Sequence, residues 1–292
     1  MKDIRYVLIT PARNEEAYIE KTIRSVISQT VLPKKWVIVS DQSTDRTDEI
    51  VRTYAKKNDF ICLVRVKERK VTSFAAKVKA FENGYMRLKG VDYEYIGNLD
   101  ADLSFGEKYY ENILQRFRGN PNLGIAGGHR FTVIGEKLIP EEHRPWSVCA
   151  GIQLFRRQCY EDIGGYVLLD RIEDTVAEIM AGMKGWEVRS FPEGKVIHHR
   201  PLGEATDRIL PLLFKYGASE YAIGYHPLYE IGKFFLRIKN EKPYFLSSAA
   251  RLSGYLWASL RRRKKALPHE IISYIRREQL KRMRLFNLSN IN

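Results

Sequence analysis

Residues 96–102 read IGNLDAD, and the apolar run from Tyr95 to Leu99 ends there in two carboxylates one residue apart. If this run is a buried strand, its end is where side chains leave the sheet for a ligand crevice. The single intervening residue would place Asp100 and Asp102 on the same side of an extended backbone. Carboxylates this close repel each other unless a cation lies between them, and a hard divalent ion could also hold a diphosphate. The pattern indicates a metal site; the alternative is a solvated pair that caps the helix predicted over 106–117.

The segments on either side of this stretch alternate between strand and helix patterns. Strands are predicted at 6–10, 36–39, 60–66 and 95–99, and the helices between them at 19–27, 47–57 and 72–88. Such alternation is typical of βαβ units, so we expect an α/β fold with a parallel sheet. Ligands bind these sheets beyond the carboxyl ends of the strands. Pro11, Asp41 and Asp100 all lie at such ends, which favours a functional role over a surface turn.

Composition sets the broad class of the protein. A chain of 292 residues with 44% hydrophobic content can bury one sizeable core plus an appendage, or form two domains. The net charge of +14 suggests a nucleic acid, a phosphate-bearing substrate or an acidic membrane surface as partner, unless it serves only solubility. The three scattered cysteines show no zinc or disulfide spacing and favour a reducing interior. No secretory signal and no apolar run long enough to span a membrane is evident.

The regular alternation fails after residue 117. Short strand-like pieces occur at 124–126, 131–134, 186–191 and 195–198, and a longer strand is predicted over 147–155. A helix opens at 170–174 with an acidic start, which also suits the helix dipole. His198 and His199 follow a strand pattern, so they should point to opposite faces and only one can face the site. Lys77, early in its helix, could reach a phosphate or simply form part of a solvated helix face.

From residue 207 onward the chain is predicted to be helical and basic. Residues 244–260 are mostly apolar and are followed by five cations at 261–265. This pattern suits a helix lying in an anionic membrane interface, with Arg251 snorkelling to the headgroups. The apolar face expected to enter the lipid consists of Tyr255, Leu256, Trp257 and Leu260. The alternative is an ordinary helical hairpin packed on the core or on a second subunit.

These motifs together resemble the family 2 glycosyltransferases, which have the GT-A fold, a Rossmann-like, mixed and mainly parallel sheet flanked by helices. The matching pieces are TPARNE at 10–15, SDQSTD at 40–45, residues 77–84, DAD at 100–102, and GGY at 164–166 followed by ED at 173–174. DAD matches the family's Asp-X-Asp signature. The resemblance covers about residues 4–205. It implies a GT-A domain over 1–205 and a basic helical region over 206–292 that associates with a membrane or with protein.

The resemblance also implies roles for particular residues. The residues implied in binding the nucleotide sugar are Pro11, Ala12, Arg13, Glu15, Asp41, Lys77, Asp100 and Ala101. Asp102 is implied as a ligand of Mg²⁺ or Mn²⁺, with Asp100 and one histidine, His198 or His199, completing the metal or diphosphate site. Asp174 is implied as the general base, with Glu173 beside it. Ser40 departs from the family, because many members have an aspartate there. The Gln-X-X-Arg-Trp signature of processive members is missing, which favours transfer of a single sugar.

We therefore expect an inverting, metal-dependent transfer of sugar from a UDP- or GDP-sugar to a glycan or lipid-linked acceptor. The expected location is cytoplasmic, peripheral at the inner face of the cell membrane, with an anionic membrane surface and a second copy of the chain as further candidate partners. A sugar-nucleotidyltransferase is the rival enzyme, but its Gly-rich loop is missing from Pro11 to Glu16. A basic nucleic-acid-binding protein would need a recognition motif, and we see none, so no nucleic acid is expected.

Overall fold

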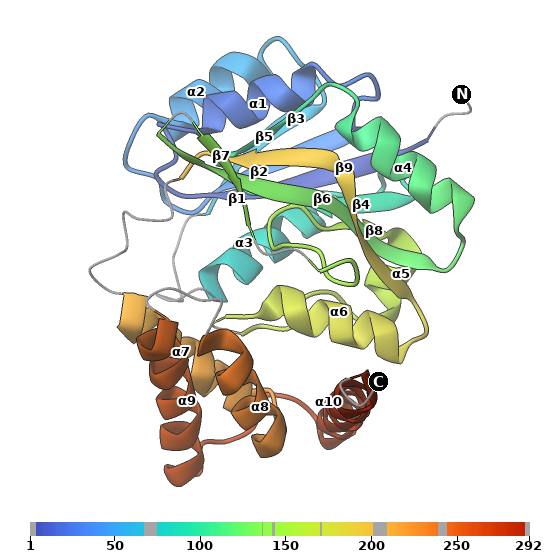
Figure 1. Cartoon of the computed structure of the whole chain (residues 1–292). Coiled ribbons are helices and arrows are strands. Elements are labelled where there is room, and N and C mark those ends of the chain that lie inside the picture. The colour runs from blue at the N-terminus through green and yellow to red at the C-terminus, as the bar shows by residue number, and fades with distance from the viewer. Residues whose placement is uncertain are drawn as a thin grey trace. The chain divides into compact units, whose positions relative to one another are not determined.

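The computed structural model describes residues 4–66, 75–135, 137–141, 144–169, 171–200, 209–238 and 244–289 (Figure 1). The chain divides into two compact units. One unit consists of Met1–Leu168 and Glu173–Leu202, and we call it the catalytic unit because the residues expected to carry the activity lie in it; the helical unit consists of Leu169–Ile172 and Gly203–Asn292. Each unit is described by itself.

The catalytic unit is built on one mixed sheet. Its strands are β1 (Tyr6–Ala12), β2 (Lys35–Ser40), β3 (Ile61–Arg65), β4 (Tyr95–Asn98), β5 (Leu103–Phe105), β6 (Leu123–Ile134), β7 (Lys137–Pro140), β8 (Leu154–Arg156) and β9 (Glu187–His198). The order is β3-β2-β1-β4-β8-β6-β9-β5, with β7 paired to β6. Strands β3, β2, β1 and β4 are mutually parallel, whereas β8 is antiparallel to β4 and β6. The predicted α/β fold is confirmed, and the carboxyl ends of β1, β2 and β4 share one edge.

Helices cover both faces of this sheet. They are α1 (Ile19–Ile27), α2 (Thr47–Ala55), α3 (Ala75–Met86), α4 (Tyr109–Gly119), α5 (Arg157–Asp162) and α6 (Glu173–Met183). Figure 1 shows α1, α2 and α4 on one face and α3, α5 and α6 on the other. Because both faces are covered, the central strands read as continuous apolar runs rather than as alternating ones.

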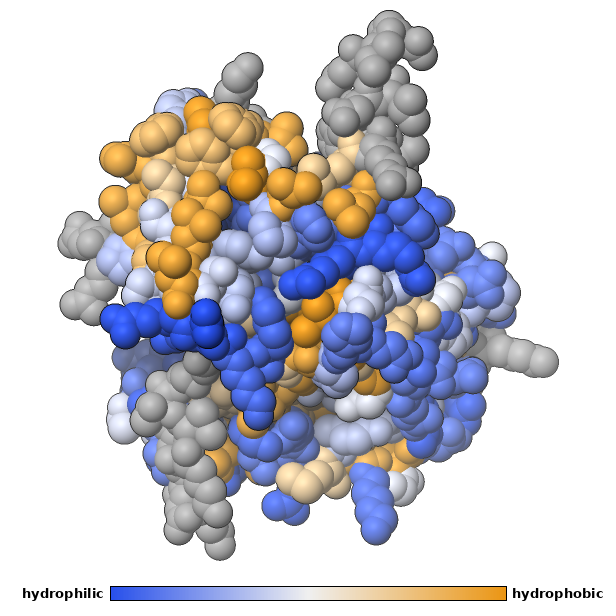
Figure 2. All heavy atoms as spheres, turned by 90° about the horizontal axis from the view of Figure 1, so that it is seen from below, coloured by the Kyte–Doolittle hydropathy of each residue, from blue (hydrophilic) through white to orange (hydrophobic). Residues whose placement is uncertain are grey.

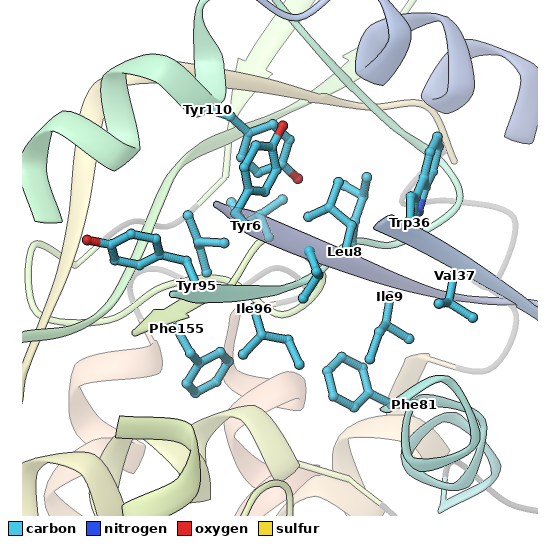
Figure 3. Close-up of a cluster of buried hydrophobic side chains, with 14 of the residues drawn as sticks. Tyr6, Leu8, Ile9, Trp36, Val37, Phe81, Tyr95, Ile96, Tyr110 and Phe155 are labelled. Atoms are coloured by element: carbon cyan, nitrogen blue, oxygen red, sulfur yellow. The ribbon is translucent and has the colours of Figure 1, made fainter. Parts of the chain in front are cut away.

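The core consists of two layers of apolar side chains, one on each side of the sheet. Tyr6 and Leu8 of β1 point to one layer with Trp36 and Tyr110, whereas Ile9 points to the other, where Phe81 and Phe155 lie (Figure 3). Successive strand residues alternate between faces, so a slip of one residue would exchange the two layers. The buried layers therefore fix the register of β1, β2 and β4. That register in turn fixes where the polar residues after each strand emerge.

The half of the sheet beyond β4, in which parallel and antiparallel pairings are mixed, differs from the sequence-based expectation. Strand β6 is one strand over Leu123–Ile134, and β9 is one strand over Glu187–His198, where separate short pieces were predicted. Their pairing shifts register between Gly128 and His129, an irregularity that interrupts the local pattern. The strand predicted over 147–155 is wrong for all but its end, because only Leu154–Arg156 pairs. Gly151 has a φ of +83°, which takes the backbone out of the strand conformation.

The helical unit contains α7 (Ile209–Ala222), α8 (Pro227–Ile238), α9 (Tyr244–Leu260) and α10 (His269–Ser289). Helices α7 and α9 pack with their backbones in close approach. A Cβ atom added to Gly217 would lie 1.8 Å from the carbonyl oxygen of Arg251, and one added to Gly254 would lie 1.9 Å from that of Phe214. Only glycine permits this contact at either position. Within the described part of the chain, none of the helices combines the length and the apolar character needed to cross a bilayer.

Candidate active site

The loops after β1 and β2 meet at the carboxyl edge of the sheet. The backbone N–H of Asp41 donates to the carbonyl oxygen of Ala12 at 2.8 Å, and Pro11 precedes Ala12 in β1. The Arg13 guanidinium lies 3.9 Å from the Asp41 carboxylate. Burial raises the pKa of Asp41, and Arg13 opposes that shift. The structure thus brings four of the predicted nucleotide-binding residues to one place.

The chain after β4 holds an ion pair between Asp100 and Lys77 of α3. The Lys77 Nζ atom lies 2.6 Å from Asp100 Oδ1, and both side chains are about a quarter exposed. The backbone N–H of Asp100 donates to the Gly151 carbonyl at 2.9 Å. A Cβ atom at Gly151 would lie 2.1 Å from Asp100 Oδ2, so this position requires glycine. Burial alone would lower the pKa of Lys77, but the neighbouring carboxylates, Asp100 above all, raise it.

Asp102 points to a different set of cations. Strand β4 ends at Asn98, and Ala101 and Asp102 form a turn rather than the extended backbone that the sequence suggested. Asp102 Oδ2 accepts a hydrogen bond from Arg200 Nε at 3.0 Å and lies 3.5 Å from His198 Nε2. Burial would raise the pKa of Asp102, but these two cations lower it to about 2. Asp100 and Asp102 are therefore neutralised by different cations.

Arg200 also binds Glu15, at the end of the TPARNE motif. Its Nη2 atom lies 2.6 Å and 2.5 Å from the two carboxylate oxygens of Glu15. Its guanidinium lies over the ring of Tyr18, 5.4 Å from the centroid. Burial raises the pKa of Glu15 to about 7, with Arg200 opposing and Asp102 adding to the shift. Arg200 thus links the first motif to the Asp-X-Asp motif. Sequence reasoning missed this role, although the arginine directly after His198 and His199 was a usable signal.

His198 is held between two carboxylates. Its Nδ1 atom lies 3.1 Å from Glu141 Oε1, while Nε2 faces Asp102. Burial would lower the pKa of His198, but the two carboxylates raise it to about 9. The ring of the next residue, His199, contacts Ser104 instead, with 2.7 Å between Nε2 and Oγ. Of the two vicinal histidines, His198 faces the acidic cluster.

Glu141 is itself held by two residues of β6. Arg130 donates to Glu141 Oε2 from Nη2 at 2.5 Å and from Nε at 2.9 Å, and Thr132 Oγ1 donates to Oε1 at 2.8 Å. Arg130 Nη1 also donates to the Ala150 carbonyl. These contacts fix the carboxylate that orients His198. No sequence pattern indicated Glu141 or Arg130, because their positions depend on the pairing of β6 with β7 and β9.

Three acidic residues lie on α6, near its start. Glu173 and Asp174 occupy its first turn, and burial raises the pKa of both, with Lys77 opposing. Glu178, one turn on, accepts from the Val148 N–H at 2.6 Å and from the Ser147 hydroxyl at 2.8 Å. Burial raises the pKa of Glu178 to about 8. The two predicted catalytic acids thus share the electrostatic environment of the Lys77–Asp100 pair.

The donor atoms around Asp102 fit a divalent cation that shares its coordination with a ligand. Within the described ranges, no three side chains of His, Cys, Asp or Glu converge as a complete metal site. Asp102 Oδ2 and His198 Nε2 do converge, 3.5 Å apart. Carboxylate oxygen and imidazole nitrogen are ligands that Mn²⁺ accepts, and Mg²⁺ often takes only one or two carboxylates plus substrate phosphates. Glu141 holds Nδ1 of His198, and Nε2 would bind such an ion in place of the proton that it shares with Asp102.

Comparison with known proteins identifies the family. The model of glycosyl transferase family 2 matches residues 7–182. The poly-beta-1,6-N-acetyl-D-glucosamine synthase of Staphylococcus epidermidis is 30% identical over 183 residues, which is 56% of this chain and 42% of that protein. The same synthase of Staphylococcus aureus strain COL is 29% identical over 199 residues, 61% of this chain and 46% of its own. The matched region thus spans less than half of either relative.

Two solved structures share the fold. The mannosyltransferase PcManGT from Pyrobaculum calidifontis, in complex with GDP-Man and Mn²⁺, superposes with a TM-score of 0.60 at 17% identity, covering 88% of this chain and 87% of that one. Residues 1–349 of S. aureus TarS, in complex with UDP-GlcNAc, give a TM-score of 0.53 at 14% identity, covering 88% and 73%. The mixed sheet and its flanking helices are those of the GT-A fold. Because the family model matches more than half of its residues, this chain belongs to glycosyl transferase family 2 and is a glycosyltransferase with the GT-A fold.

Proposed function

We propose that the protein transfers one sugar from a nucleoside diphosphate sugar to an acceptor hydroxyl, with inversion at the anomeric carbon. The observation that carries this proposal is that Asp100 and Asp102 follow β4 with different cationic partners, and that Asp100 and Lys77 interact with the acids at the start of α6. Lys77 and Arg200, the partners of these carboxylates, give the site positive charge for a diphosphate, and the α6 acids supply a base. The names of the relatives and of the solved complexes support a UDP- or GDP-sugar as donor.

The donor would lie along the carboxyl edge of β1, β2 and β4. Asp41 accepts a hydrogen bond from the base or ribose, next to Arg13. Lys77 and Arg200 each pair with acids of the site and would supply positive charge for the phosphates of the donor. Glu15 and Asp102 then keep Arg200 in place, because its guanidinium has donors to spare for both.

Mg²⁺ or Mn²⁺ would be held by Asp102 and His198, close to Asp100, together with oxygens of the diphosphate. When bound, it would neutralise the charge that develops on the departing nucleoside diphosphate. Glu141 accepts the Nδ1 hydrogen of His198 and so leaves Nε2 as the atom that faces Asp102. Lys77 adds a fixed positive charge on the other side of the Asp-X-Asp turn.

Asp174 takes the proton from the attacking acceptor hydroxyl. Its pKa is raised by burial, which makes its carboxylate a stronger base, while the nearby Lys77 keeps the ionised form accessible. Glu173 precedes it in the same helical turn and has a raised pKa from the same cause. A base on one side of the sugar and the leaving group on the other produce a single displacement through an oxocarbenium-like transition state.

The acceptor we propose is a glycan or a lipid-linked glycan precursor, reached from the cytoplasm at the inner face of the cell membrane. The relatives named as poly-beta-1,6-N-acetyl-D-glucosamine synthases support a glycan product. The absence of the Gln-X-X-Arg-Trp signature supports transfer of one sugar at a time.

A panel of nucleotide sugars tests this function. Purified protein is incubated with UDP- and GDP-linked sugars, with Mn²⁺, with Mg²⁺ or with EDTA, and both thermal stabilisation and release of nucleoside diphosphate are measured. One donor should stabilise the protein and be hydrolysed slowly, and only when a divalent ion is present. Equal results with and without EDTA would refute the metal dependence, and no response to any donor would refute the donor class.

A further inference from the structure

The helical unit has a charged interior. Glu220 of α7, which is 3% exposed, pairs with cations from α8 and α9: Lys233 Nζ at 2.6 Å, Arg237 Nη2 at 3.0 Å and Arg251 Nη2 at 2.9 Å. Lys233 also pairs with Glu230 at 3.1 Å. These five groups form a network that we call the buried charge cluster. Such a cluster in the interior is unusual for a soluble helical domain, where charges are mostly exposed.

The side of α8 that faces away from the buried charge cluster is apolar and exposed. Glu230, Lys233 and Arg237 follow one another at helical spacing and face the buried charge cluster. On the opposite side, Leu228, Ile231 and Phe235 follow the same spacing, and Phe235 is 64% exposed. A surface helix of a water-soluble protein normally turns its apolar stripe inward. Helix α8 has the reverse arrangement.

Helix α9 also has a stripe of exposed apolar side chains, which adjoins that of α8. Phe245 and Leu246 lie in its first turn, and Leu256 and Leu260 follow about three and four turns later on the same stripe. Phe234 contacts Phe235 and Phe245, with ring centroids 5.3 and 5.9 Å apart, so the stripes of α8 and α9 adjoin. We call the following set the apolar surface: Leu228, Ile231, Phe235, Leu236, Phe245, Leu246, Leu256 and Leu260. Figure 2 shows apolar side chains gathered in this way, with strongly hydrophilic residues at their border.

The net charge of the helical unit indicates which kind of partner covers the apolar surface. Residues 203–292 contain seventeen Lys and Arg against seven Asp and Glu, a net charge of +10 out of +14 for the chain. Arg261, Arg262 and Lys264 are exposed and follow Leu260 directly. A second copy of the chain would bring the same positive charge to the contact, and the two copies would repel each other. An anionic lipid surface offers both hydrocarbon and negative charge.

The structure changes which residues can face lipid. Tyr255 and Trp257, expected there from the sequence, are engaged within the unit: Tyr255 is 3% exposed and donates to the Tyr225 carbonyl, and Arg263 lies over the Trp257 ring. Arg251 does not snorkel, because it pairs with Glu220. Lys265 donates to a backbone carbonyl, and burial lowers its pKa to about 8.

We propose that the apolar surface lies in the interface of an anionic bilayer, with α8 and α9 in the membrane plane and Arg261, Arg262 and Lys264 at the lipid phosphates. The apolar side chains would enter the boundary between headgroups and acyl chains, as in other interfacial helices. The buried charge cluster satisfies the polar groups on the inner sides of these helices away from lipid. The inference rests on the proposed membrane location, and its test uses no sugar donor, so its failure would be distinct from a failure of the proposed sugar transfer.

Vesicle flotation tests the proposal with the full chain. Vesicles of phosphatidylcholine alone, and with about a third phosphatidylglycerol, are mixed with protein at low and high salt. The apolar variant replaces Leu228, Ile231 and Phe235 with Ser, and the charge variant replaces Arg261, Arg262 and Lys264 with Gln. Matched controls change equally exposed residues of the catalytic unit: Leu32, Met86 and Leu138 to Ser, and Lys56, Lys57 and Lys89 to Gln. Circular dichroism and thermal unfolding confirm that each variant is folded.

We expect the wild type and both controls to float with anionic vesicles at low salt and less well at high salt. Each basic residue near such a surface is worth about fivefold in binding, so the charge variant should bind about a hundredfold more weakly. The apolar variant should lose flotation at both salt concentrations. A wild-type protein that stays soluble with anionic vesicles at low salt overturns the proposal. So does a concentration-dependent dimer that the apolar variant abolishes, because the apolar surface would then belong to a second copy.

Discussion

The catalytic unit and the helical unit place their charges in opposite ways. In the catalytic unit, apolar side chains fill both layers beneath the helices, and the charged groups gather at one edge of the sheet. In the helical unit, two buried glutamates pair with three partly buried cations, and most of the exposed large apolar side chains of the described residues belong to this smaller unit. The hydrophobic effect explains the first arrangement, because it favours the burial of apolar side chains away from water. The second arrangement is expected of a unit whose surface faces an apolar partner, rather than water, over part of its area.

The charge of a glutamate in the interior also differs between the two units. Glu220 is surrounded by three cations, which lower its pKa despite burial. Glu178 is held by the neutral donors Val148, Ser147 and Gln153, and burial raises its pKa to about 8. The difference teaches that burial alone does not decide the charge of an acid, since the neighbouring groups do. The predictions below test each side of this contrast.

The largest effect is expected on sugar transfer, from a substitution in the proposed active site. Asp174→Asn keeps the shape of the side chain and removes its basicity, so sugar transfer should fall by about two to four orders of magnitude. Donor affinity, measured by calorimetry, should barely change. Glu173→Gln is the matched comparison, because it alters the preceding acid of the same turn. If the loss appeared in donor affinity instead, or if only Glu173→Gln lost activity, Asp174 would not be the base.

The next effect concerns the buried charge cluster. Glu220→Gln leaves three cations without their shared carboxylate, which should cost about 3–5 kcal/mol of local stability. Hydrogen exchange measured by mass spectrometry should show faster exchange in α7, α8 and α9, while the catalytic unit is unaffected. Glu278→Gln serves as control, because it removes an exposed pair with Lys281. Unchanged exchange in α7–α9 would mean that the cluster does not hold this unit together.

A smaller effect is expected at Glu141, which positions His198 rather than touching the donor. Glu141→Gln should weaken Mn²⁺ binding in the presence of nucleoside diphosphate by about 10- to 100-fold, the usual worth of such an orienting partner. Titration followed by electron paramagnetic resonance measures this binding without turnover. Nucleotide affinity in EDTA should stay as in the wild type. If Mn²⁺ bound equally well to the variant, Glu141 would have only a structural role in the β6–β7 region.

The last effect is spread over a range of pH and concerns Glu178 and the pH dependence of stability. Its pKa in the folded chain, about 8, lies above the ordinary 4.5, so the folded state retains a proton that the unfolded state releases between these values. The free energy of unfolding should therefore fall as pH rises from about 4.5 to 8, and this one group contributes up to about 1.4 kcal/mol per pH unit. Glu178→Gln should flatten the slope in denaturation series. An identical slope in the variant would show that Glu178 titrates normally.

Local periodicity made the parallel half of the sheet predictable. Apolar runs that end in Pro11, Asp41 and Asp100 indicated strands with a common carboxyl edge, because such runs are buried on both faces. The same reasoning failed over 147–155, where the backbone at Gly151 turns to let Asp100 approach. It also failed to predict that Asp100 and Asp102 face different cations. The turn after β4 that separates them depends on contacts with α1 and with Arg200.

Long-range pairing explains what the sequence could not indicate. Glu141, Arg130 and His198 meet only because β6 pairs with both β7 and β9. In the helical unit, the spacing in α8 predicts two faces but not which of them is buried. The cations there pair with Glu220 of another helix, and no local pattern shows that partner.

The most direct test of the proposed catalytic edge is the binding of UDP and GDP, measured by calorimetry with Mn²⁺ and with EDTA, to the wild type and to Asp102→Ala. The wild type should bind one of the two nucleotides much more tightly with Mn²⁺ than with EDTA. The variant, with its fold intact by circular dichroism, should lose that difference, because Asp102 and His198 together offer the donor atoms for the ion. Equal Mn²⁺-dependent binding by the variant would contradict the assignment of Asp102.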